Sequence, residues 1–140
     1  MEKAAEVQRY VKSIDVPVYE SPTADHRRFK LLIERDISGT KAVAFGEFIL
    51  PPKQAQPHAK AFPQTEKIFY VLSGRGSIVV DSVDHEIEQG MALYVAPGEA
   101  HAFANTGNDE LRLLWFEAPP QCEVGGYMPQ AQDWKRITPR

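Results

Sequence analysis

The stretch GMALYVAPGEAHAFANTG, residues 90–107, decides the fold. Within it the large side chains of His101, Phe103 and Asn105 alternate with alanines. An extended strand would therefore carry the large groups on one face and the small ones on the other. A Pro-Gly pair, typical of a turn, comes just before. The pattern predicts a strand beginning at His101, with one imidazole among bulky groups on the wall of a small-ligand cavity.

Strand-forming runs continue on both sides of this stretch. Short segments rich in β-branched and aromatic residues extend from about Arg28 to Glu117, with turn residues between them. This rhythm predicts an all-β barrel or sandwich. The predicted strands are Arg28–Arg35, Ala42–Leu50, Lys67–Leu72, Gly76–Asp81, Asp84–Ile87, Ala92–Val95, His101–Ala104 and Leu111–Glu117. A loose apolar face also predicts a short helix over Lys3–Ile14.

Two stretches of the chain resemble the motifs of the cupin superfamily. The second motif of that family reads G-x5-P-x-G-x2-H-x3-N. Four of its residues stand here at the required spacing, namely Gly90, Gly98, His101 and Asn105. Ala96 occupies the place of the usual first proline. The phrase FYVLSGRG, at residues 69–76, is similar to the end of the first motif.

The resemblance covers about residues 46–105 and implies a fold. It implies an all-β jelly-roll barrel, the double-stranded β-helix of cupins, formed by a single domain over residues 1–140. We expect its core over about residues 28–118, an N-terminal extension with a short helix or strand over residues 1–27, and a C-terminal tail over residues 119–140. The tail, rich in Gly and Pro, would lie over the barrel or over a partner subunit.

The first motif of the family, G-x5-H-x-H-x3-4-E-x6-G, is not reproduced. In proteins that this chain resembles, it supplies three of the usual four metal ligands. Counted back from Gly74, the ligand positions fall on Lys60, Phe62 and Lys67. None of these side chains is a good metal ligand at neutral pH. This alignment leaves only His101 and favours a barrel without a metal.

A second alignment keeps three ligands. It starts at His58, uses a longer loop and takes Glu66 as the carboxylate, so that His58, Glu66 and His101 would hold Fe, Mn, Ni or Zn. Alternate residues of the strand at Glu66 and Lys67 point to opposite faces. Both faces are apolar, so the pattern alone leaves open which of these two residues points inward, although the spacing to Gly74 favours Lys67.

Without a metal, chemistry would depend on the protein's own side chains. The candidate catalytic residues are His101, Lys67 and His58. The histidines offer proton transfer, and Lys67 offers an anion anchor or an amine nucleophile. Burial would disfavour the charge of Lys67 unless a carboxylate or an anionic ligand compensated it. The candidate ligand-binding residues are Gln56, Lys60, Phe69 and Phe103.

Two functions stay open at this stage. The first is an enzyme that acts on a small polar or anionic metabolite inside the barrel, as isomerases, lyases, cyclases and dioxygenases among similar small cupins do. The second is a barrel that binds or senses a small molecule without chemistry. The loss of the first motif favours a binding or sensing barrel. The intact spacing of the second motif favours an enzyme.

Composition limits the partners. Sixteen Lys and Arg face nineteen Asp and Glu, and no basic block interleaved with aromatics indicates a nucleic-acid groove. No apolar run approaches the roughly 20 residues that cross a bilayer, so we expect no membrane contact and a cytoplasmic location. Cys122 is the only cysteine in the sequence, which excludes a disulfide within the chain. The edge-like Arg28–Arg35 strand and the aromatic tail predict a homodimer that covers sheet edges.

Overall fold

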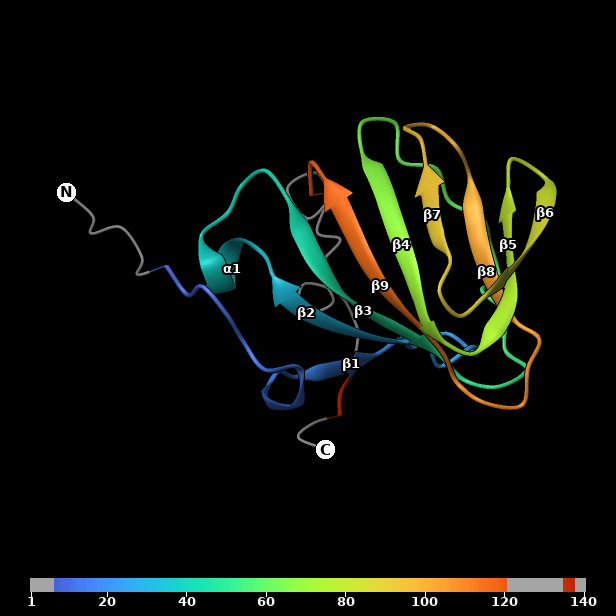
Figure 1. The fold of residues 1–140 in the computed structure, drawn as a ribbon, viewed down its shortest axis with the longest axis horizontal. Coiled ribbons are helices and arrows are strands. Elements are labelled where there is room, and N and C mark those ends of the chain that lie inside the picture. Colours follow the sequence, from blue (N-terminus) through green and yellow to red (C-terminus); the bar gives the residue numbers. More distant parts are fainter. Residues whose placement is uncertain (1–6, 121–134, 138–140) are drawn as a thin grey trace.

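The computed structural model describes residues 7–120 and 135–137, drawn as a coloured ribbon in Figure 1. Cys122 and most of the predicted tail lie outside the described residues. Within them, no helix has the length and apolar character needed to span a membrane.

The strands form two antiparallel sheets, of order β10-β1-β2-β3-β9-β4-β7 and β6-β5-β8. In Figure 1 the smaller sheet stands beside the β4 and β7 end of the larger one. The strands of the larger sheet are β1 (Val18–Glu20), β2 (Arg28–Ile33), β3 (Ala44–Leu50), β4 (Glu66–Ser73), β7 (Ala92–Val95), β9 (Leu111–Ala118) and β10 (Lys135–Arg136). Those of the smaller sheet are β5 (Arg75–Val80), β6 (Val83–Glu88) and β8 (His101–Asn105). All eight predicted strands are present, and the predicted all-β jelly-roll barrel is confirmed.

The N-terminal segment differs from its prediction. The predicted helix is wrong for residues 7–14, since the described part is irregular up to the short 3-10 helix η1 (Ser13–Asp15). Its apolar face was too weak to be buried, and Ile14 stays 78% exposed. Ser13 instead ties the segment to the outer face of the larger sheet, where its hydroxyl receives a hydrogen bond from Lys30 Nζ at 2.9 Å.

The strand predicted over Arg28–Arg35 is neither as long as expected nor at an edge. β2 ends at Ile33, because the Glu34 side chain caps the one-turn helix α1 (Arg35–Ser38) by accepting from the N–H of Ile37 at 2.8 Å. β1 pairs along the outer side of β2, and β10 pairs with β1 in turn. This strand therefore leaves no open edge for a partner subunit.

The hydrophobic core lies between the two sheets. Phe103 of the smaller sheet packs against Phe48 and Phe69 of the larger one, with ring centroids 5.5 and 4.9 Å apart. Burying each such ring stabilises the fold by about 2 kcal/mol. The inward residues of both sheets form one cluster, which contains Leu31, Ala44, Phe48, Leu50, Phe69, Val71, Ile78, Ile87, Val95, Phe103, Leu111, Leu113 and Trp115.

Two motif residues serve the fold rather than a ligand. Asn105 donates through Nδ2 to the carbonyl oxygens of Leu50, Pro51 and Asp109, and its Oδ1 accepts from the N–H of Gly107. Gly46 allows a close approach, since a Cβ there would lie 2.5 Å from the ring of Trp115. Asn105 thus holds the loops at one end of the barrel, and the glycine makes room for Trp115 inside it.

Candidate functional site

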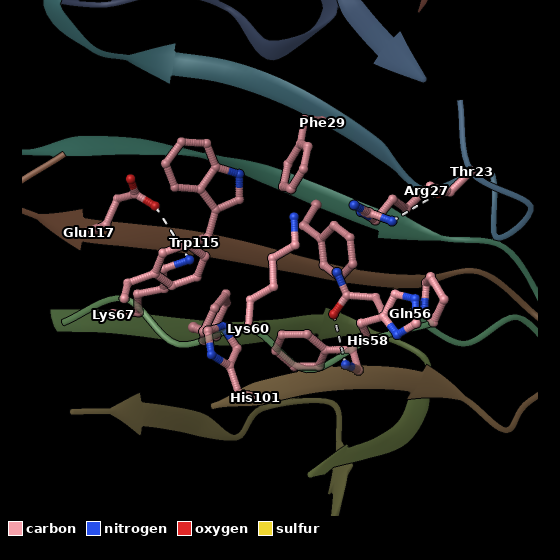
Figure 2. A pocket seen from close by; sticks show the side chains of 15 residues that line it. Thr23, Arg27, Phe29, Gln56, His58, Lys60, Lys67, His101, Trp115 and Glu117 are labelled. Atoms are coloured by element: carbon pink, nitrogen blue, oxygen red, sulfur yellow. Dashed lines mark hydrogen bonds and ion pairs between the residues drawn. The ribbon is translucent and has the colours of Figure 1, made fainter. Parts of the chain in front are cut away.

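The interior of the barrel contains a cavity of about 210 Å³. Its walls combine aromatic rings with a few charged and polar groups, seen from close by in Figure 2. The lining residues are Thr23, Arg27, Phe29, Phe48, Gln56, Pro57, His58, Lys60, Phe62, Lys67, Phe69, His101, Phe103, Trp115 and Glu117. A mostly apolar cleft with few convergent polar groups is the usual form of a small-molecule site.

Strand β4 presents a lysine to this cavity. Lys67 and Phe69 are buried on its inner side, whereas Glu66 is exposed on its outer side. There the Glu66 carboxylate accepts a hydrogen bond from the Tyr94 hydroxyl at 2.7 Å. The Lys67 side chain therefore points into the barrel and the Glu66 side chain points outward, which decides between the two orientations that the alternation left open.

Lys67 meets a carboxylate on the neighbouring strand. Lys67 and Glu117 are direct cross-strand partners in the β4–β9 register, so both side chains point into the barrel. Lys67 Nζ lies 3.8 Å from Glu117 Oε2 and 3.8 Å from the ring centroid of Phe62. Lys67 is 7% exposed and Glu117 is 1% exposed. The inner end of the cavity thus holds a buried ion pair against an aromatic face.

Burial weakens the hold of Lys67 on its proton. The pKa of Lys67 falls to about 8, mainly because burial disfavours the charged ammonium and also because Lys60 adds a like charge. The Glu117 carboxylate opposes this fall by stabilising the ammonium. At neutral pH most Lys67 side chains are protonated, and a minor fraction is the neutral amine.

His101 stands beside this pair on β8. It is 7% exposed, its ring centroid lies 5.9 Å from that of Phe62, and its Nδ1 is buried with no hydrogen-bond partner among the described residues. The pKa of His101 falls to about 4, first because of burial and then because of the charge of Lys67. The imidazole is therefore neutral at physiological pH and can accept or donate a proton.

Residues 54–60 run along β8 and bring Lys60 to the level of His101. The backbone N–H of Lys60 donates to the His101 carbonyl at 3.1 Å, and the N–H of His101 donates back at 3.0 Å. Further along, the Gln56 side-chain oxygen accepts from the N–H of Phe103 at 2.8 Å. Lys60 lines the cavity and is also exposed to solvent, so it lies at the cavity mouth.

A third cation, Arg27, borders the cavity. Arg27 Nη1 donates to Asp25 Oδ2 at 2.7 Å and to the Thr23 hydroxyl at 3.0 Å. Figure 2 shows Lys67 and Glu117 at one end of the view, Arg27 and Thr23 at the other, and Lys60 between them. The charged side chains that line the cavity are thus Arg27, Lys60, Lys67 and Glu117.

Most predicted site residues lie together in the cavity. His101, Lys67, His58, Gln56, Lys60, Phe69 and Phe103 all line it, and Glu66 does not. Sequence reasoning missed Glu117 and Arg27. Glu117 shares strand parity with Trp115 and could have been placed inward by that alternation, whereas no local signal marks Arg27.

The described residues do not fit the metal that the resemblance implies. Among them, no group of three or more His, Cys, Asp or Glu side chains is arranged to hold an ion. His58 and His101 line the cavity, but the third ligand of the second alignment, Glu66, points away from it. The ammonium of Lys67 also lies where it would repel a cation.

Comparisons with known proteins agree with this architecture. The family model described as "Cupin domain" matches residues 46–117. The dimethylsulfoniopropionate lyase DddW of Ruegeria pomeroyi is 34% identical over 109 residues, which cover 76% of this chain and 68% of that protein. An oxalate-binding protein of Thermotoga maritima is 31% identical over 83 residues, which cover 59% of this chain and 68% of that protein.

A solved structure supports the same fold. A protein of Thermotoga maritima described as a predicted oxalate decarboxylase superposes with a TM-score of 0.69 at 24% identity, covering 79% of this chain and 98% of the other. At that identity the likeness shows the fold alone. The chain spans 45% to 68% of the length of the curated relatives that it matches.

Titration of the Lys67 side chain tests these electrostatics. In protein labelled with ¹³C-lysine, the Lys67 ¹³Cε signal, assigned by its loss in Lys67→Arg, should titrate near pH 8. In Glu117→Gln the midpoint should fall further, because the stabilising carboxylate is gone. In Lys60→Met it should rise, because a like charge is gone. A wild-type midpoint near the ordinary value of about 10.4 would contradict the buried position.

Proposed function

The chain belongs to the cupin family, and we propose that its barrel binds a small carboxylate or similar anion and processes it with the protein's own side chains instead of a bound metal. The observation that carries this proposal is the charge of the cavity. Three cationic side chains, Arg27, Lys60 and Lys67, line it against one carboxylate, Glu117. The whole chain has a net charge of -3, so the cavity differs in sign from the rest of the molecule.

Electrostatics in such a cavity favour an anion. Aromatic walls lower the local dielectric constant, so each cation acts more strongly on a ligand than it would in water. Glu117 offsets one of the three positive charges, and Asp25 pairs with Arg27 from outside the lining. Lys60 makes no ion pair with the described residues. We therefore assign Lys60 as the main anchor for the anionic group.

Proton transfer is the chemistry that these side chains offer. His101 is a neutral imidazole that would take or return a proton, and Lys67 is an ammonium that would stabilise negative charge on a reacting oxygen. Such a pair serves reactions that begin by moving a proton next to a carbonyl or carboxylate, which is the chemistry of many isomerases and lyases. His58, at the exposed side of the cavity, would be a second proton carrier.

The names of two relatives support a carboxylate as the ligand class. One relative is a lyase of dimethylsulfoniopropionate and another binds oxalate, and both molecules are small carboxylates. Identities of 34% and 31% do not transfer either substrate to this chain. The two names favour a small carboxylate as the class of ligand, and the cations of the cavity favour the same class.

A binding or sensing module is the second candidate. Of the four ligand positions of the family, only His101 keeps its usual residue here, and a barrel that has lost its ligands can still hold a small anion. Analysis of the bound compound after long incubation separates the two candidates. A compound returned unchanged favours the module, and a new product favours the enzyme.

We also propose that the chain forms a homodimer through the outer face of β4, β7 and β9. Ile68, Tyr70 and Tyr94 are 46%, 43% and 57% exposed there. Ile68 is paired in register with Tyr94 on one side and Phe116 on the other, which makes the apolar surface continuous. A second copy of the chain would cover this surface by two-fold symmetry.

Binding of a small carboxylate tests the proposed function. Succinate at about ten times its Kd should raise the free energy of unfolding by about 1.4 kcal/mol, and so the melting temperature by roughly 3–6 °C. The shift should persist in EDTA, shrink in Lys60→Met and survive in Lys41→Met, a control at an exposed lysine outside the cavity. If a panel of small mono- and dicarboxylates produces no shift, the proposed ligand class is wrong.

Sedimentation equilibrium tests the dimer. The wild-type protein should be dimeric at micromolar concentration, and Tyr70→Glu should raise the dimer dissociation constant by at least about 100-fold, because it buries a charge in an apolar contact. The matched control is Val83→Glu, at an exposed apolar residue on β6. A monomeric wild-type protein, or equal weakening by both variants, would rule this surface out.

A further inference from the structure

We propose that Lys67 forms an imine with the carbonyl carbon of a small 2-oxo acid or aldehyde acid held in the cavity. This step deepens the proposed function and rests on it, because the carboxylate of the molecule has to bind in the barrel first. It would make Lys67 the reacting residue, beyond its part in holding charge.

Lys67 Nζ is placed where a ligand in the cavity can reach it. The atom lies at the inner end of a cavity that opens to solvent, 3.8 Å from the Phe62 ring centroid and 3.8 Å from Glu117 Oε2. A ligand that enters the cavity meets this nitrogen on the wall. Glu117 Oε2 lies within ion-pair distance of Nζ, so a base for the ammonium proton stands beside the nitrogen on the cavity wall.

The protonation state of the Lys67 amine also favours imine formation. An imine needs a neutral amine, which an exposed lysine supplies at about four parts in ten thousand near pH 7. Burial and the neighbouring charge of Lys60 lower the pKa of Lys67 to about 8. The neutral fraction at pH 7 is then roughly two hundred times larger than in an ordinary lysine. Desolvated lysines of this kind are the usual imine-forming nucleophiles.

Glu117 supplies the proton transfers that the reaction requires. It takes a proton from the Lys67 ammonium, and the free amine attacks the carbonyl carbon, so that an N–C bond forms as the C–O π bond breaks. Glu117 then gives a proton to the oxygen and takes one from the nitrogen. Finally it protonates the hydroxyl, the C–O bond breaks and water leaves. The product is a protonated imine beside the regenerated carboxylate, and no oxidant or reductant is consumed.

The remaining charged groups orient the ligand for this attack. Lys60 lies between the ends of the cavity, and Arg27 lies at the end opposite Lys67 in Figure 2. A carboxylate held by Lys60 would leave the adjacent carbonyl carbon facing Lys67. The protonated imine draws electrons from the neighbouring carbon, and the neutral imidazole of His101 can take a proton from that carbon. The arrangement suits a short acid whose carbonyl is next to its carboxylate.

Reductive trapping tests the imine directly. The full-length protein is incubated with pyruvate and sodium cyanoborohydride, digested, and each lysine peptide is quantified by mass spectrometry. Lys67 should carry the reduced adduct at least about tenfold faster than any other lysine at pH 7. Its labelling rate should rise with pH and level off above about pH 8, where the amine becomes mostly neutral. Labelling spread evenly over the exposed lysines, with none preferred at Lys67, would overturn the proposal.

Matched probes and variants separate this inference from the proposed function. Lactate has the carboxylate without the carbonyl and should stabilise the protein without forming an adduct. Acetone has the carbonyl without the carboxylate and should label Lys67 more slowly than pyruvate does. Lys67→Arg keeps the cation and should lose the adduct while lactate still binds. Binding of pyruvate and lactate with no adduct would refute the imine alone, and failure of these two and of the whole carboxylate panel to bind would refute the proposed function as well.

Discussion

The buried ion pair between Lys67 and Glu117 is the constraint on which the rest of the interior depends. Either charge alone would be too costly to keep in an aromatic cavity, since an uncompensated buried charge destabilises a protein by several kcal/mol. The β4–β9 register sets the two residues opposite each other and so allows both to remain. Burial, together with the ammonium fixed there, lowers the pKa of His101 and keeps its imidazole neutral. The same ammonium would repel a metal cation and, in the function that we propose, attract an anion.

Regular alternation made much of this barrel predictable. The pattern around His101 and Phe103 places both on the cavity wall. All eight predicted strands are present, because runs of β-branched and aromatic residues are separated by turn residues. The direction of Glu66 and Lys67 could not be predicted from β4 itself, since both of its faces are apolar. It depends on pairing with β9, a contact that no local pattern encodes. The helix predicted over Lys3–Ile14 is wrong for the described residues 7–14, where Ile14 of the expected apolar face is exposed.

The cupin fold alone does not define the reaction, because function depends on which side chains occupy the site positions of the fold. Counted from the motif glycine, the family's ligand positions carry Lys60, Phe62 and Lys67 here. These three side chains and His101 all line the cavity, with Lys67 and His101 both beside Phe62 and with Lys60 nearer the cavity mouth (Figure 2). The same positions that would coordinate an ion thus present two ammonium groups and an aromatic ring. In the function that we propose, a few substitutions at fixed backbone positions replace a cation site with a site for an anion.

Elemental analysis tests this account most directly. The untagged protein is equilibrated with Fe, Mn, Ni and Zn in turn, desalted, and measured by plasma mass spectrometry. The account predicts that no metal is retained in stoichiometric amount, whereas Lys67→Glu, which restores a carboxylate at the inner end of the cavity, retains more than the wild type. About one transition-metal ion per wild-type chain, lost in His101→Ala, would contradict the central claim that the cavity works with the protein's own cations.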